Sequence, residues 1–88
     1  MWIEEVTDEL SAIYGAKAGE VARTIIPPCL ADFGKMLGKA APGSRVSEEY
    51  KTEDEKALLI FAGEKTEEGR RLISVTVNGK EIAADIRL

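Results

Sequence analysis

The sequence contains no histidine and only one cysteine, Cys29. Histidine is the commonest general base in enzymes, a common metal ligand and the side chain that most often changes its charge near neutral pH. Its absence removes the commonest residue for each of these three roles. A lone cysteine forms no intrachain disulfide, and without histidine it cannot complete an ordinary zinc site. We therefore predict a protein that is not an enzyme and has no catalytic residue, metal or cofactor. In this interpretation Cys29 packs in the core between Ile26 and Leu30.

Long apolar segments and a basic leader are also lacking. The longest uninterrupted apolar run, Ala57 to Ala62, is far shorter than the roughly 20 residues that a membrane-spanning helix needs. The first residues, MWIEEVTDE, are acidic where a secretory signal is basic. A single free cysteine is typical of reducing compartments. These features together predict a cytoplasmic protein that does not contact membranes.

The chain has 88 residues, of which 44% are hydrophobic and 32% are charged, with a net charge of −4. A chain of this length buries about 60–65% of its unfolded surface, which is enough for one modest core. We therefore predict a single domain over residues 1–88. Apolar residues recur at helical spacing in residues 1–41, whereas apolar and polar residues alternate in residues 44–88. This order indicates an α+β fold, with two or three N-terminal helices packed on a four-stranded antiparallel β-meander.

An apolar stripe at three- and four-residue spacing predicts a first helix that ends at Gly15. The stripe consists of Trp2, Ile3, Val6, Leu10, Ile13 and Tyr14. A second helical segment is expected over residues 16–26. Pro27 and Pro28 lack the backbone N–H and are expected to break the helix there. Pro28 can then open a third helix over residues 28–37, so the region holds either two helices or three.

Alternation with a period of two begins at Arg45 and predicts a first strand, followed by a turn at residues 53–55. The next segment, residues 56–62, is apolar on both faces, which predicts a central strand with both faces covered. A second turn is expected over residues 63–69, where glycine and charged residues gather.

The pair Asn78-Gly79 lies between two alternating runs. It is the pair that best tolerates the positive φ angles of a type I′ turn, so it predicts a two-residue β-hairpin. Such a hairpin sets Val77 opposite Lys80, and an uninterrupted register then sets Val75 opposite Ile82.

The acidic residues are concentrated in one segment. Residues 48–55 hold five acids and one lysine. A surface of this kind favours a basic partner, because complementary charge speeds association and adds specificity. We predict that partner contacts come from this segment, with Tyr50 as an aromatic anchor. The candidate contact residues are Glu48, Glu49, Tyr50, Glu53, Asp54 and Glu55. The four acids within residues 4–9 would enlarge the surface if the fold brings them close.

These features favour a non-catalytic protein-binding module: a small acidic inhibitor or adaptor that docks on a larger, basic, nucleic-acid-handling protein complex. Phage-encoded inhibitors of bacterial defence complexes are often small, acidic and poor in motifs. This is an analogy of type without matching residues. The alternative is that the acids only keep the domain soluble.

Two other interpretations stay open. A self-associating structural or assembly subunit, such as a virion component or a chaperone, would form a homodimer through apolar side chains on the second face of the sheet. The residues expected there are Leu59, Phe61 and Leu72. A winged-helix DNA-binding protein would use residues 30–39 as its recognition helix. The chain has no basic stripe, however, which disfavours direct binding to nucleic acid.

Overall fold

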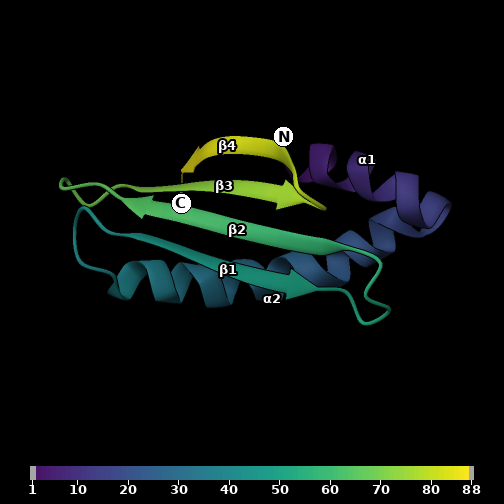
Figure 1. Ribbon diagram of the computed structural model, residues 1–88, viewed down its shortest axis with the longest axis horizontal. Coiled ribbons are helices and arrows are strands. Elements are labelled where there is room, and N and C mark those ends of the chain that lie inside the picture. Colours follow the sequence, from purple (N-terminus) through teal and green to yellow (C-terminus); the bar gives the residue numbers. More distant parts are fainter. Residues whose placement is uncertain (1, 88) are drawn as a thin grey trace.

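The helices precede the sheet along the chain, and the computed structural model describes residues 2–87. The helical part consists of α1 (Trp2–Tyr14), a single 3-10 turn η1 (Gly15–Lys17) and α2 (Ala18–Lys39). The strands are β1 (Arg45–Lys51), β2 (Leu58–Lys65), β3 (Arg71–Val77) and β4 (Lys80–Arg87). Figure 1 shows the four strands side by side with the helices packed along them. The predicted α+β class is confirmed.

The predicted apolar stripe forms the inner face of α1. Val6 and Leu10 are completely buried. Gly15 follows the helix with a φ of +60°, which residues with a side chain rarely adopt, and α1 ends there as predicted. The other stripe residues pack against the core while partly exposed: Trp2, Ile3, Ile13 and Tyr14.

The prediction that Pro27 and Pro28 break the helical region was wrong, because α2 continues through both for a total of 22 residues. Both prolines are exposed, and the carbonyls left without donors one turn earlier also belong to exposed residues, where water can bind them. Ile26 and Cys29 flank the pair and are buried in the core. Their packing outweighs the local cost of proline, about 3 kcal/mol in a helix interior. The winged-helix alternative therefore loses its separate recognition helix.

The sheet is an antiparallel meander in the order β1-β2-β3-β4. The strand β2 is central, as predicted, but it extends to Lys65, so the turn after it spans residues 66–70 and not 63–69. Both helices cover the same face: α2 packs on β1 and β2, and α1 packs on β3 and β4 (Figure 1). The other face of the sheet has no helix over it among residues 2–87.

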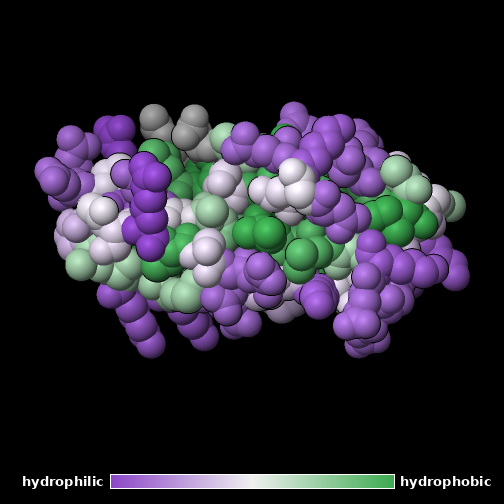
Figure 2. Space-filling view, in the orientation of Figure 1, coloured by the Kyte–Doolittle hydropathy of each residue, from purple (hydrophilic) through white to green (hydrophobic). Residues whose placement is uncertain are grey.

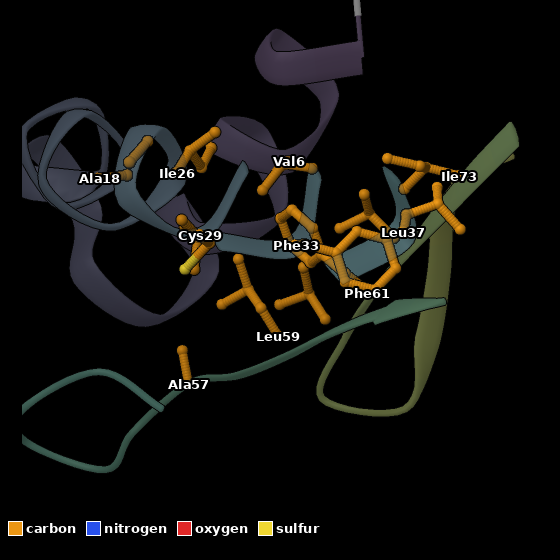
Figure 3. Packing of buried hydrophobic residues seen from close by; sticks show 14 residues of the cluster. Val6, Ala18, Ile26, Cys29, Phe33, Leu37, Ala57, Leu59, Phe61 and Ile73 are labelled. Carbon is orange, nitrogen blue, oxygen red and sulfur yellow. The ribbon is translucent and has the colours of Figure 1, made fainter. Parts of the chain in front are cut away.

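The core lies between the helices and the sheet. Leu59 and Phe61 of β2 are completely buried there, and the ring of Phe33 from α2 meets Phe61 edge-on at a centroid distance of 5.9 Å (Figure 3). The prediction that Leu59 and Phe61 lie on the second face was wrong, and only Leu72 is on that face. The sequence of a strand that is apolar on both faces does not show which face is buried. In the structure, Leu59 pairs with Val77 and Phe61 pairs with Val75, and both valines are buried on the helix side.

The helix α2 approaches β2 most closely at Gly63. A Cβ atom at this position would lie 2.9 Å from Cζ of Phe33 and 3.1 Å from Cδ2 of Leu37. These separations are shorter than ordinary van der Waals contact, so only glycine fits. The missing side chain lets α2 lie flat on the β1–β2 side of the sheet.

The turn between β3 and β4 places Val77 opposite Lys80. Asn78 and Gly79 between them have φ angles of +49° and +85°, the signs that a type I′ turn requires. The backbone N–H of Leu58 donates to Oδ1 of Asn78 at 2.8 Å, which ties this turn to the start of β2.

The uninterrupted register predicted beyond this turn was wrong. Val75 pairs with Ala83 instead of Ile82, and Ile73 pairs with Ile86, so the register shifts twice along β4. Each shift places an extra residue in β4, which is the geometry of a β-bulge. Sequence alternation alone does not show such insertions.

Every helix and strand contributes to one hydrophobic cluster, so the protein is a single small α+β domain in the described region. The two outer strands contribute partly buried residues to this cluster, namely Val46, Tyr50, Ile82 and Ile86. Within residues 2–87, none of the helices has both the length and the apolar character needed to cross a membrane.

Candidate functional site

The cysteine lies in the middle of α2 and not at a helix N-terminus, where a reactive thiol would be activated. Cys29 is 4% exposed, and burial, followed by the nearby charge of Asp32, raises the pKa of its thiol to about 11. The thiol is therefore protonated at neutral pH and packs as a small apolar group, as predicted. In the described residues, no three side chains of the types that ligate metals are grouped as a metal site would need.

The predicted contact segment is divided by the strand it lies on. Side chains alternate along β1, so Glu48 and Tyr50 lie on the helix side of the sheet and Glu49 lies on the opposite side. The ring of Tyr50 meets Phe61 edge-on at 5.6 Å and is half-buried against the core. Tyr50 is therefore a packing residue first, and its role as an exposed anchor is not supported by its placement.

Asp54 holds the turn between β1 and β2 to the end of α1. Its Oδ1 accepts hydrogen bonds from the hydroxyl of Tyr14 at 2.7 Å and from that of Thr52 at 2.7 Å, and a third from the backbone N–H of Lys56 at 3.1 Å. These bonds, with that of Tyr14 the strongest, lower the pKa of Asp54 from 3.8 to about 2. Asp54 therefore has a structural task that the sequence did not indicate.

The remaining acids of the segment are free of internal ion pairs. We call Glu48, Glu49, Glu53 and Glu55 the β1-edge acids. All four are exposed, and the ion pairs found within residues 2–87 involve none of them. Over residues 45–56, five acids outnumber three bases. The segment therefore has two more acids than bases. Of the β1-edge acids, Glu48 and Glu49 lie on β1 itself, and Glu53 and Glu55 lie in the turn that follows it.

The acids of α1 do not join this surface. The helix α1 packs on β3 and β4, which are at the edge of the sheet away from β1. Glu9 instead pairs with Lys80 of β4, with 3.3 Å between Oε2 and Nζ. The structure thus separates the two acidic regions that would have had to meet to form one large negative surface.

A recess of about 540 Å³ opens beside the β1-edge acids, between the first turns of α2 and the end of β1. Its apolar wall is formed by Val21 and Ile25, which are half-buried, and by Tyr14. Its rim carries charge of both signs, from Lys17, Glu20, Lys51 and Glu53 among others. The volume is within the range of sites that hold a small ligand or a single partner side chain, about 300–1,000 Å³.

The face of the sheet away from the helices carries an apolar strip in its middle. The strip consists of half-buried residues from β2 and β3: Leu58, Ile60, Ala62 and Leu72. Figure 2 shows hydrophobic residues along the middle of the molecule, with hydrophilic residues on both sides of them. Polar residues of the same strands, Ser74 and Thr76, interrupt the strip, so it is narrow.

Comparison of the chain with models of known protein families, with curated proteins and with solved structures found no match. The β1-edge acids, which the sequence indicated as partner contacts, are exposed, and their contact with a partner stays a prediction. It missed the recess, because the recess depends on the contact between Tyr14 and Asp54, which are 40 residues apart.

Proposed function

We propose that the protein is a non-catalytic protein-binding module, a small acidic inhibitor or adaptor that docks on a larger protein with a basic surface. The observation that supports this is the set of β1-edge acids, which are exposed and belong to no ion pair found within residues 2–87. An excess of exposed negative charge in one segment attracts an oppositely charged partner and helps to fix its orientation. A nucleic-acid-handling complex in the cytoplasm would offer such a basic surface, as the targets of phage-encoded inhibitors do.

The structure shows which acids can be substituted to test this proposal. Asp54 must be kept, because its loss would release the turn from α1. The test variant is therefore Glu53→Lys with Glu55→Lys. The matched control is Glu67→Lys with Glu68→Lys, which makes the same charge change in the exposed turn between β2 and β3.

The experiment is an affinity pull-down from a bacterial lysate with three baits: the wild type, the test variant and the control variant. We expect the wild type and the control to retain the same basic proteins, with less retained at high salt because screening weakens exposed charges. The test variant should lose them. Retention of the same proteins by all three baits would contradict the proposal.

A second candidate function, a self-associating structural subunit, is favoured by the apolar strip on the open face of the sheet. The strip contains Leu72 but neither Leu59 nor Phe61. Sedimentation of the wild type and of Ile60→Lys tests it. A dimer that the substitution dissociates, and that persists at high salt, would support assembly through this face, whereas a wild-type monomer at all concentrations would exclude it.

A further inference from the structure

Both edges of the sheet, β1 and β4, lack an outer partner strand in the described region, and the β1 edge is the regular one. The hydrogen bonds from Lys65 to Ser44 and from Thr52 to Ala57 show that even-numbered residues of β1 bond toward β2. The alternate residues therefore direct their backbone groups away from the sheet. These are Arg45, Ser47, Glu49 and Lys51, all of them exposed, and no backbone bond joins their outward groups to other described residues.

The register of β1 with β2 is unbroken over all seven residues of the strand. The outward N–H and C=O groups are consequently evenly aligned, as a template for an added strand must be. The other edge does not offer this, because the two register shifts interrupt β4. An incoming extended segment would find a regular row of hydrogen-bonding groups only at β1.

The charges on β1 select against a second copy of the chain. If two β1 strands paired antiparallel over their full length, Glu48 would face Glu48 of the copy, and Arg45 would face Lys51. Like charges directly opposite each other destabilise a strand pair. A basic segment would also meet Arg45 and Lys51 on the side of the strand that carries Glu49, but on the helix side it meets Glu48, which is exposed and belongs to no ion pair found within residues 2–87. Basic side chains of an added strand therefore suit its helix side.

The recess lies at the C-terminal end of the same edge. A strand added to β1 would direct alternate side chains toward the helix side of the sheet, as Glu48 and Tyr50 do. At the end of β1 such a side chain reaches the recess, whose wall contains Val21 and Ile25. An apolar side chain suits this wall, because both residues are only half-buried without it.

We propose that the partner contributes an extended basic segment that pairs as a fifth strand with the outer edge of β1 and places one apolar side chain in the recess. This inference rests on the proposed function and adds the form of the partner. Backbone hydrogen bonds would supply affinity, and the recess with the β1-edge acids would supply selectivity.

Synthetic peptides of 7 residues, the length of β1, provide the probes. The test peptides alternate lysine with valine, and a leucine replaces the lysine nearest one end or the other, so that lysine and leucine share the side that meets Glu48 and the recess. The two positions of the leucine distinguish the two strand directions. A peptide with glutamate in place of lysine removes the charge complementarity. A peptide with proline in place of valine keeps the charge but cannot form a strand. Fluorescence anisotropy measures binding of each peptide to the purified protein.

The decisive variant is Ser47→Pro, with Ser47→Ala as its control. Proline removes one outward N–H without removing a bond between β1 and β2, and proline is tolerated at such edge positions. We expect Ser47→Pro to weaken binding of the lysine–valine peptide about tenfold and Ser47→Ala to weaken it less than about twofold. Equal binding by the two variants would overturn the inference, as would the absence of binding by every peptide.

Amide hydrogen exchange gives a second measurement that needs no substitution. Strand addition should slow exchange at Ser47 and Glu49 when the peptide is present, because their N–H groups then gain acceptors. Protection confined to other parts of the sheet would overturn the inference. The experiments distinguish failure of this inference from failure of the proposed function. If Glu53→Lys with Glu55→Lys weakens peptide binding but Ser47→Pro does not, the acidic docking surface is supported and strand addition is wrong.

Discussion

The two edges of the sheet are protected by different means. The strand β4 is interrupted by two register shifts and lies against α1. The strand β1 keeps an unbroken register, and four of its seven residues are charged. Bulges and charges both discourage unwanted pairing at sheet edges. They differ in selectivity, because a bulge rejects any incoming strand, whereas charge rejects only strands of unsuitable charge. The β1 edge can therefore be specific where the β4 edge is simply closed.

The largest expected loss of stability concerns the packing of α2 on β1 and β2. Gly63→Ala would place a Cβ atom 2.9 Å from the ring of Phe33, so α2 must move away from β2. Overpacking of this kind costs about 1–3 kcal/mol. Urea denaturation measures the loss of unfolding free energy, and hydrogen exchange should show that it falls mainly on β1 and β2.

The neighbouring residue provides the control for this prediction. Ala62 is half-buried on the open face, so Ala62→Val should change stability by less than about 0.5 kcal/mol. If Gly63→Ala proved as stable as the wild type, the packing of α2 on β2 would not depend on the missing side chain at Gly63. The strands β1 and β2 would then be held to the helices no more tightly than β3 and β4 are.

A smaller effect is expected at the turn that ends the β1 edge. Because the pKa of Asp54 lies below 3.8, its carboxylate stabilises the fold above that pH, and this contribution is lost as the pH falls through about 2. Tyr14→Phe removes the strongest of its hydrogen bonds and should raise the pKa of Asp54 toward 3.8. Carboxyl NMR titration of the wild type and the variant measures both midpoints, and identical midpoints would show that Tyr14 does not clamp the turn.

The smallest effect is expected from the ion pairs, one on each side of the sheet. Lys80 and Glu9 are 3.3 Å apart on the β4 side, and Arg45 and Glu64 are 3.7 Å apart on the β1 side. Exposed pairs of this kind contribute about 0.2–1 kcal/mol at most. Double-mutant cycles at low and high salt should give similarly weak, salt-sensitive couplings for both pairs. A coupling well above about 1 kcal/mol on one side only would mean that this edge is held by charge.

Elements that depend on local pattern were predictable from the sequence. The stripe of α1 and the turn at residues 53–55 follow from residue spacing and turn composition, and both are present. Pro27 and Pro28 show where local rules fail, because burial of Ile26 and Cys29 keeps the helix continuous through them. The sequence does not state how strongly distant residues pack against a segment.

The candidate site was only partly predictable for the same reason. Exposure of the β1-edge acids follows from their charge, but the different task of Asp54 depends on Tyr14 at the far end of α1. The inner position of Leu59 and Phe61 depends on β3 and on the space left at Gly63. A glycine inside an apolar strand was the one local signal of close helix packing.

Cys29 is buried directly after the two prolines of α2, so its thiol can report when α2 separates from the sheet. The thiol is inaccessible while α2 lies on the sheet, so a thiol reagent can react only in molecules whose helix has lifted. Because the chain has one cysteine and one tryptophan, on different helices, labelling kinetics follow α2 and Trp2 fluorescence follows α1. Comparison of the two rates would show whether the helices leave the sheet together or one after the other.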